Sequence, residues 1–377
     1  MNIEVVGTST RNKGAELMLV AIKQHYAAYD GRVQLAVTPW FGSYADRAKY
    51  GLLQKVEPLR WGRSRLGMSI LPSSFKRSYG LIEESDINAV IDASGFAFGD
   101  QHPVERSRRF ASDVERWKKQ GKQIVLLPQA FGPFEKPAIR DAFRRILDQV
   151  DLVYARDTAS FEHIRSVGAD KGKLLLAPDI TLGVRVDRAS ESSQEGTSTV
   201  YVVPNSRMLD KTSKKEAGAY IPFLKRCIEA TGRQGLTPKL LLHDTAEDHV
   251  IADELVRQAG TGIDVVREPD PVRLKSILGN ARLVIGSRFH ALVGALSQAI
   301  PTLAVGWSHK YDTLMNDFEC PDMVLSPNDN GERIEELIQV AIRDHDTLVL
   351  NLQRAGDRMR DQLEDMWRTV DSVVLES

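Results

Sequence analysis

The sequence has few cysteines: Cys227 and Cys320 are the only two among its 377 residues. No closely spaced Cys or His accompanies either of them, which argues against a disulfide framework and against a structural zinc site. We expect both thiols to be packing residues. An excess of one charge is also lacking, because 50 Lys and Arg are balanced by 51 Asp and Glu. The net charge of −1 gives the protein no general attraction to nucleic acid or to anionic lipid.

The sequence also lacks a long apolar run that could cross a membrane. Its longest uncharged stretch, residues 291–307, contains Gln298 and Pro301 and follows Arg288 and His290. This pattern predicts a buried helix followed by a strand. The first ten residues lack the charged start and the longer apolar stretch of a signal peptide. We therefore expect a cytoplasmic enzyme or binding protein with no integral membrane segment.

Apolar residues are nevertheless plentiful, at 42% of the sequence, and charged residues make up 27%. This composition predicts a globular protein, and the length suggests about two to three domains. Short apolar runs alternate with amphipathic helical segments, the pattern of a parallel sheet covered by helices. We interpret as strands the runs at residues 3–7, 33–37, 89–94, 124–127, 152–155, 174–177, 199–203, 239–243, 263–267, 282–285, 301–305 and 323–325.

A polar segment divides these strands into two series. Residues 187–198 contain no large apolar side chain and are rich in Ser, Glu and Gly, which predicts a linker. We therefore predict an α/β protein with two Rossmann-like domains, residues 1–186 and 199–345, that face a cleft. A helical extension over residues 346–377 could cross back onto the first domain. Such sheets bind ligands at the carboxyl ends of their strands, so we expect a site that draws residues from both halves.

One region departs from this alternation. Residues 55–77 contain a single acid, Glu57, and six basic residues: Lys55, Arg60, Arg63, Arg65, Lys76 and Arg77. The segment is either a solvated loop or a lid or flap that binds an acceptor.

The turn at residues 7–15 follows the first strand and opens a helix, a place where backbone N–H groups can hold an anion. It is not a nucleotide triphosphate-binding loop, because Asn12 occupies the position of that loop's second Gly and Gly14 that of its Ser or Thr. No Gly-x-Gly-x-x-Gly follows any strand, which weakens a dinucleotide-binding interpretation. The turn is either a ligand contact or a simple start of the helix.

Two later strands are followed by polar residues. Gln129 comes just past the strand at 124–127 and could hydrogen-bond a ligand rich in hydroxyls, or the neighbouring Pro and Gly simply shape a loop. Arg156 ends the strand at 152–155 and could bind a carboxylate or phosphate through two parallel hydrogen bonds. The alternative for Arg156 is an ion pair with Asp157 or Asp179.

The most informative segment is the turn at residues 286–290, between a strand and a helix. Ser287, Arg288 and His290 lie within five residues at a helix N-terminus, which favours anions. Arg288 can hold an anion, and His290 can exchange a proton near neutral pH. Lys310 follows the next strand and could neutralise a phosphate. Because no H-E-x-x-H, G-x-S-x-G or D-x-D pattern is present at these strand ends, we expect a cationic site without a metal.

Taken in order, these segments resemble the polysaccharide pyruvyltransferase family, from about residue 5 to residue 320. The segments that carry the resemblance are NKGAE (12–16), LPQAFGP (127–133), ARDTAS (155–160), PD (178–179), GSRFHALVGALSQAIP (286–301) and Lys310. The resemblance implies the fold of two-domain glycosyltransferases of the B type (GT-B). It also implies transfer of the enolpyruvyl group of phosphoenolpyruvate to two hydroxyls of a sugar, which forms a cyclic ketal and releases phosphate.

The resemblance further implies roles for individual residues. Arg156 and Arg288 would hold the carboxylate and phosphate of phosphoenolpyruvate, with the Phe289 backbone nearby, and His290 would be the acid/base. Supporting contacts would come from Asn12, Gln129 and Lys310. We also expect Ser287, which precedes Arg288, to contact the substrate. No cofactor is implied, since phosphoenolpyruvate is a substrate.

The implied partner is a saccharide acceptor, lipid-linked or polymeric, so the basic segment at residues 55–77 could bring the protein to the inner face of the membrane. A homo-oligomer is compatible with the sequence. The main alternative function is a GT-B glycosyltransferase that uses a nucleotide-sugar donor.

The sequence departs from the family pattern at DASGFAFGD, residues 92–100, where many relatives have a glycine-rich turn. Phe96 and Phe98 replace small residues there. They either stack on the acceptor or pack a rearranged loop. Asp100 and His102 are candidate polar groups on the acceptor side, or else solvated surface residues.

Overall fold

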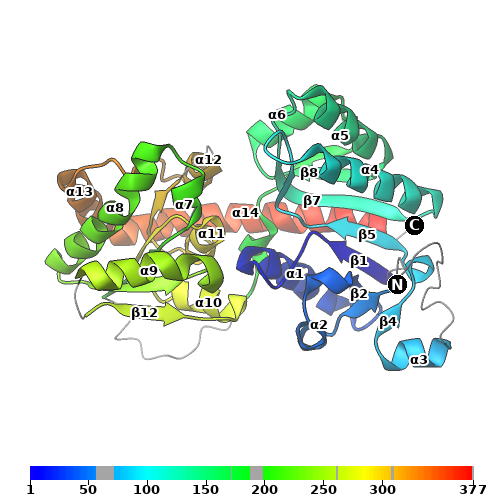
Figure 1. Ribbon diagram of the computed structural model, residues 1–377, viewed down its shortest axis with the longest axis horizontal. Helices are drawn as coiled ribbons and strands as arrows, with labels where there is room; N and C mark the ends of the chain where they lie inside the picture. The colour runs from blue at the N-terminus through cyan, green and yellow to red at the C-terminus, as the bar shows by residue number, and fades with distance from the viewer. Residues whose placement is uncertain (57–71, 171, 187–197, 260–261, 307–309, 376–377) are drawn as a thin grey trace. The chain divides into compact units, whose positions relative to one another are not determined.

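The computed structural model describes residues 1–56, 72–170, 172–186, 198–259, 262–306 and 310–375 (Figure 1). The chain divides into two compact units. The first comprises Met1–Ile180 together with Asp361–Ser377, and the second comprises Thr181–Arg360. The division therefore falls slightly before the boundary predicted at residue 186, and residues 187–197 of the predicted linker lie outside the described residues.

The first unit is built on a sheet whose paired strands all run parallel, in the order β4-β3-β2-β1-β5-β7-β8-β9, with β6 paired to β7. Short buried apolar runs form most of these strands, as expected of a sheet covered on both faces. Their bounds are β1 Asn2–Val6, β2 Gln34–Val37, β3 Leu53–Lys55, β4 Leu81–Ile82, β5 Ala89–Asp92, β6 Phe96–Phe98, β7 Gln123–Phe131, β8 Leu152–Ala155 and β9 Leu174–Leu176.

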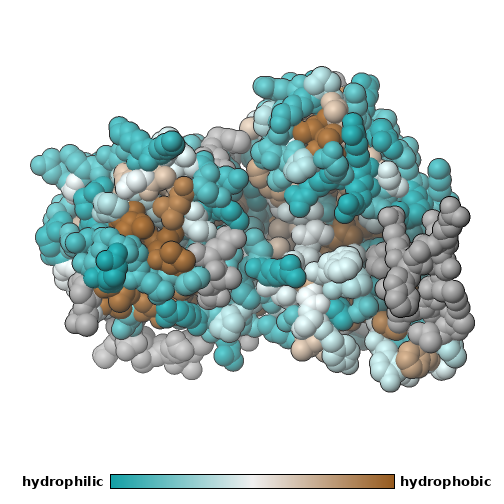
Figure 2. Space-filling view, viewed as in Figure 1, coloured by the Kyte–Doolittle hydropathy of each residue, from teal (hydrophilic) through white to brown (hydrophobic). Residues whose placement is uncertain are grey.

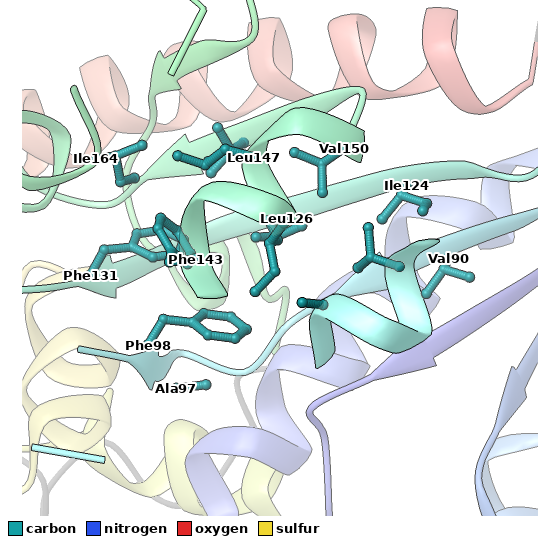
Figure 3. Close-up of a cluster of buried hydrophobic side chains, with 14 of the residues drawn as sticks. Val90, Ala97, Phe98, Ile124, Leu126, Phe131, Phe143, Leu147, Val150 and Ile164 are labelled. Atoms are coloured by element: carbon teal, nitrogen blue, oxygen red, sulfur yellow. The ribbon is translucent and has the colours of Figure 1, made fainter. Parts of the chain in front are cut away.

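Helices connect these strands and bury their apolar faces against the sheet. They are α1 Lys13–Tyr26, α2 Tyr44–Tyr50, α3 Ser73–Ser78, α4 Val104–Lys119, α5 Pro137–Gln149 and α6 Thr158–Val167, with short 3₁₀ turns η1 Ala27–Tyr29, η2 Pro39–Phe41, η4 Glu84–Asp86 and η5 Ile180–Gly183. Figure 3 shows part of this unit's core, in which Phe98, Phe131 and Phe143 lie together.

The second unit repeats the plan with a six-stranded sheet in the order β12-β11-β10-β13-β14-β15, again with parallel pairs. Its strands are β10 Thr199–Val203, β11 Thr237–Leu242, β12 Asp264–Arg267, β13 Leu283–Gly286, β14 Thr302–Val305 and β15 Val324–Leu325. Its helices are α7 Arg207–Asp210, α8 Lys214–Arg233, α9 Thr245–Ala259, α10 Pro271–Leu278, α11 Phe289–Leu296, α12 Lys310–Asp317 and α13 Gly331–Arg343. The predicted α/β class with two Rossmann-like domains is confirmed.

The last helix, α14 His345–Val374, contributes residues to both units. Its C-terminal part packs on the first unit, where Asp371 accepts hydrogen bonds from the Tyr29 hydroxyl at 2.6 Å and pairs with His25 Nε2 at 2.9 Å. The Trp367 ring stacks on His25 with centroids 4.1 Å apart. The hydrogen bond to Asp371 raises the pKa of Tyr29 to about 12. The end of the chain is thus part of the N-terminal unit.

Each sheet has one point at which its strand order reverses. In the first unit, β1 lies between β2 and β5, with Val6 opposite Asp92. In the second, β10 lies between β11 and β13, with Val203 opposite Gly286. The loops leaving two such strands go to opposite faces of the sheet, and ligands of α/β proteins bind beside them, at the carboxyl ends of the strands. These two reversal points are therefore where a site is expected.

Two sequence expectations are corrected by the fold. We predicted that Gln129 follows its strand, but β7 continues to Phe131 because a register irregularity between Leu126 and Gln129 accommodates Pro128 inside the strand. We also placed Lys55 in a solvated loop or flap. It ends β3 instead, is buried, and pairs with Glu4 at 2.6 Å. Residues 57–71 of that basic segment lie outside the described residues.

The visible surface is mainly polar (Figure 2), as expected of a chain in which 27% of the residues are charged. Figure 2 shows polar residues over most of the visible face of each unit, with apolar residues in small groups between them. Among the described helices, none is both long enough and apolar enough to span a bilayer.

Candidate functional site

The turn between β13 and α11 lies at the reversal point of the second sheet, and Ser287 fixes it. The Ser287 backbone N–H donates to Val203 O at 3.1 Å, and its carbonyl accepts from Asn205 Nδ2 at 2.6 Å and from the Tyr311 hydroxyl at 2.9 Å. Its hydroxyl lies 2.7 Å from that of Tyr220. We predicted Ser287 as a substrate contact, but it is fully buried. Its side chain therefore holds the turn through hydrogen bonds within the protein, and its role as a substrate contact stays a prediction.

Arg288 is the next residue. Its guanidinium lies between two carboxylates, that of Asp248 in α9 and that of Asp244 just before α9. Nε and Nη2 of Arg288 donate to the two oxygens of Asp248 at 2.9 and 2.5 Å, and Nη1 lies 3.8 Å from Asp244. Such a two-point contact fixes the plane of the guanidinium as well as its position. Burial raises the pKa of Asp248, and the Arg288 cation opposes that rise.

Asp248 is a site residue that the sequence analysis missed. It is fully buried and also accepts from the Ser206 backbone N–H at 2.9 Å, so it ties together the turns that follow β10 and β13. The available signal was a pair of aspartates four residues apart, Asp244 and Asp248, after an apolar strand. At that spacing two side chains share one face of a helix. Their partner is 40 residues away in the chain, so spacing alone does not identify it.

The remaining predicted residues of this unit are Phe289, which follows Arg288, and two residues near its ring, His290 and Lys310. Helix α11 begins at Phe289, and Arg288 at its N-cap makes no side-chain capping hydrogen bond. An anion at this end of α11 would take the place that a capping side chain usually fills. His290 is half-buried in the first turn, and its ring meets that of Phe289 edge-on at 5.7 Å. Lys310 Nζ lies 5.3 Å from the Phe289 ring centroid and 5.3 Å from that of Tyr311.

The reversal point of the first sheet has a different chemistry. Asp92 ends β5 and is buried, and its carboxylate accepts from the Ser94 hydroxyl at 2.5 Å and from Gln129 Nε2 at 2.6 Å. Burial raises the pKa of Asp92 to about 6, although both hydrogen bonds oppose the rise. Within the described part of the chain, Gln129 Oε1 has no hydrogen-bond partner. Gly7 is required here because it has φ +81 and a Cβ on it would lie 2.2 Å from Ser94 Oγ.

Arg156 lies at the carboxyl end of β8, next to Gln129. Its backbone N–H donates to the Gln129 carbonyl at 3.0 Å, and its Nη1 donates to Asp179 at 3.0 Å. Both side chains of this ion pair are almost completely buried. The sequence left open whether Arg156 pairs with Asp157 or with Asp179, and in the structure it pairs with Asp179. Asp157 instead caps α6, because its carboxylate accepts from the Ser160 N–H at 2.7 Å.

The side chain of Asn12 starts a helix. Its Oδ1 accepts from the backbone N–H groups of Gly14 and Ala15 at 2.9 and 3.2 Å, so Asn12 is the N-cap of α1. The structure thus assigns the amide oxygen of Asn12 to helix capping, the simpler of the two sequence interpretations.

Packing also decides between the two interpretations of the DASGFAFGD segment, residues 92–100. Phe98 is buried in the core among other Phe rings (Figure 3), so it packs the loop and does not stack on an acceptor. Phe96 is half-buried and meets the His102 ring edge-on. Asp100 accepts from the backbone N–H of Glu135 at 2.7 Å and of Lys136 at 3.2 Å, which holds the loop before α5.

Among the described residues, no group of three or more His, Cys, Asp and Glu side chains could hold a metal ion. Cys227 and Cys320 are unbonded to each other and buried, and burial raises the pKa of Cys320 to about 12. Both thiols therefore pack in the second unit, as their spacing predicted.

Two parallel-sheet units, each with polar residues at its reversal point, define a GT-B-like protein. Solved structures of this class include HepE from Anabaena in complex with UDP-glucose, which is 14% identical with a TM-score of 0.61 and covers 99% of this chain and 100% of that one. A putative UDP-N-acetylglucosamine 2-epimerase from Listeria monocytogenes is 9% identical with a TM-score of 0.59, over 99% of this chain and 98% of that one. At such identities the likeness concerns the fold.

The sequence narrows this class to one family. Residues 12–309 match the polysaccharide pyruvyl transferase family, and the chain belongs to it. A curated relative, the amylovoran biosynthesis protein AmsJ from Erwinia amylovora, is 20% identical over 261 residues, which cover 63% of this chain. The match spans 60% of that relative's length. The family resemblance proposed from the ordered motifs is thereby confirmed.

Proposed function

We propose that this protein transfers the pyruvyl group of phosphoenolpyruvate to two hydroxyls of a sugar in a polysaccharide or its precursor, as a cyclic ketal. The observation that carries the proposal is the turn at residues 286–290. An oriented guanidinium, a histidine and a helix N-terminus converge there in a chain of the polysaccharide pyruvyl transferase family. Phosphoenolpyruvate is a small anion with a carboxylate and a phosphate, and both groups suit such a turn.

In this proposal the anion binds in the second unit. Arg288 donates to it from a guanidinium whose plane Asp248 has already fixed, so little orientational freedom is lost on binding. The backbone N–H groups of Phe289 and His290 at the start of α11 point along the helix dipole, which favours negative charge. Lys310, which lies over the Phe289 ring, adds a second positive charge to the same surface. These fixed charges would stabilise the phosphate as it leaves.

His290 is proposed to move the protons. The reaction adds one proton to the methylene carbon of phosphoenolpyruvate, which becomes the methyl group of the ketal. Two acceptor hydroxyls form C–O bonds and lose one proton each, while the C–O bond to phosphate breaks. One of the two protons balances that gained by the methyl group and the other leaves with phosphate. An imidazole can both give and accept a proton near neutral pH, which this sequence of steps needs.

Roles in the first unit follow from its chemistry. Arg156 is proposed as a second anion-binding residue, because Asp179 holds its guanidinium in a fixed orientation at the carboxyl edge of the sheet. Gln129 is proposed as a supporting contact for a hydroxyl-rich ligand, because its buried Oε1 is an acceptor without a partner among the described residues. Asn12 supports the same edge through the cap of α1.

A product assay tests the proposal. The protein is incubated with phosphoenolpyruvate and a panel of methyl glycosides, and both phosphate release and the methyl signal of a pyruvate ketal are followed by NMR. We expect equal amounts of phosphate and ketal with at least one glycoside. The nucleotide-sugar alternative predicts instead a glycosylated product and a nucleoside diphosphate from UDP-glucose or GDP-mannose, with no ketal.

A further inference from the structure

Two aromatic rings on the first unit are far more exposed than aromatic side chains usually are. Trp40 is 79% exposed and Tyr44 is 71% exposed, and they are the two most exposed large hydrophobic side chains of the described residues. Aromatic rings carry a large apolar surface, and leaving it in water is unfavourable. Exposed apolar surface next to a ligand-binding edge is a candidate contact for a ligand.

The position of these rings ties them to the ligand-binding edge of the sheet. Trp40 lies in η2, directly after β2, and Tyr44 begins α2. The segment is bound to the turn after β1, because the Thr10 N–H donates to the Phe41 carbonyl at 3.0 Å. The rings therefore lie at the carboxyl edge of the first sheet, beside the turn that leads from its reversal point into α1.

The segment that carries the rings is rigid. Phe41, between them, is buried, and its ring meets that of Tyr50 edge-on at 6.3 Å. Ser43 and Asp46 form a reciprocal capping box at the start of α2. Gly42 allows a close approach, because a Cβ on it would lie 2.7 Å from Thr10 Oγ1. Trp40 and Tyr44 thus project from a fixed backbone rather than from a loose loop.

We infer that Trp40 and Tyr44 form a platform on which a sugar ring of the saccharide acceptor stacks. The inference rests on the proposed function, because the polysaccharide acceptor of that reaction is the occupant. The C–H face of a pyranose is apolar and matches the face of an indole or phenol ring, while its hydroxyls stay in water or bond to neighbouring polar groups. Rigid aromatic rings give such contact area at a low cost in side-chain entropy.

Substitution of the rings tests the platform in the transfer reaction. Trp40→Ala should raise the acceptor KM by about tenfold, which corresponds to about 1.4 kcal/mol, and leave the phosphoenolpyruvate KM unchanged. Trp40→Phe, which keeps a ring, should recover most of the loss. The matched control is Tyr79→Ala, which removes another exposed aromatic ring of the same unit. An acceptor KM in Trp40→Ala equal to that of wild type would overturn the inference.

A second measurement needs no turnover. Acrylamide quenching of tryptophan fluorescence is compared for wild type and Trp40→Phe, so that the difference reports Trp40 alone. Dextran, galactan and mannan serve as probes. At least one should shield Trp40 from quenching, whether or not phosphoenolpyruvate is a donor. Shielding without ketal formation would reject the proposed function and keep the platform. No shielding by any of the three would reject the platform, as would shielding by phosphatidylethanolamine–phosphatidylglycerol vesicles only.

Discussion

The two reversal points of this protein share one backbone plan but differ in chemistry. In the second unit a guanidinium, an imidazole and the start of a helix meet at the end of β13. In the first unit the end of β5 has a buried carboxyl group, Asp92, and an amide, Gln129, with exposed aromatic rings after the neighbouring β2. The same backbone plan thus presents different side chains at its two edges, which is why we proposed a small-anion site in the second unit and acceptor contacts in the first.

The largest expected effect comes from removing the imidazole in the second unit. His290→Ala should lower kcat by about 10²- to 10⁴-fold, because a positioned acid/base contributes on that scale. Phosphoenolpyruvate binding should persist, since Arg288 and Asp248 remain. His249→Ala, which removes an exposed histidine of the same unit, is the control. A variant at position 290 that keeps wild-type kcat would show that the second edge binds without catalysing.

The next largest effect is on the pH dependence of the free energy of unfolding, and it comes from Asp92 in the first unit. Its pKa is raised to about 6 in the fold, from 3.8, by burial. The folded state therefore holds this proton more tightly than the unfolded state. Its contribution is present in full below the unfolded pKa and is lost as the pH rises through the folded pKa. The free energy of unfolding should fall by about 2 kcal/mol from this group between about pH 4 and pH 7.

Urea unfolding of wild type and Asp92→Asn over this pH range measures the effect. An amide cannot ionise, so the variant should lack this part of the pH dependence and gain relative to wild type as the pH rises. Parallel pH profiles for the two proteins would show that Asp92 does not hold a proton at the first edge, and the contrast between the edges would weaken.

A smaller effect should follow from loosening the guanidinium of the second unit. Asp248→Asn removes the charge that fixes Arg288 and should raise the phosphoenolpyruvate KM by about tenfold, with a smaller change in kcat. Asp253→Asn, on the exposed face of the same helix, is the matched control. Steady-state kinetics with phosphoenolpyruvate varied at saturating acceptor separates the two constants. If KM is unchanged while stability falls, Asp248 has only a structural role.

Much of this contrast was predictable from the sequence, and the rest depended on contacts between distant segments. The strands at 152–155 and 199–203 appear in the structure with the predicted bounds. Short apolar runs between helical segments are typical of buried strands in a parallel sheet. The predicted end of β7 was wrong. Pro128 suggested that a loop begins there, but a register irregularity keeps the strand paired. Short strands such as β3 and β4 leave too weak a pattern to detect.

The residues of the candidate site have local signals in the sequence, whereas their hydrogen-bond partners do not. Arg288, His290 and Lys310 were identified from their place after a strand or at a helix start, a local feature. The burial of Ser287 and the helix cap made by Asn12 were not predicted, because both depend on neighbours that the local pattern does not name. Asp248 could not be assigned to Arg288 for the same reason. The exposure of Trp40 and Tyr44 was also missed, because exposure is visible only in the fold.

Calorimetric titration shows whether the turn after β13 binds phosphoenolpyruvate through Arg288. Wild type, Arg288→Lys and the control Arg333→Lys, an exposed ion-paired arginine of the same unit, are each titrated with phosphoenolpyruvate and with UDP-glucose. We predict that phosphoenolpyruvate binds wild type and the control alike and binds Arg288→Lys at least about tenfold more weakly, because Lys cannot make the two-point contact. Equal affinity for all three proteins, or binding of UDP-glucose alone, would contradict the account.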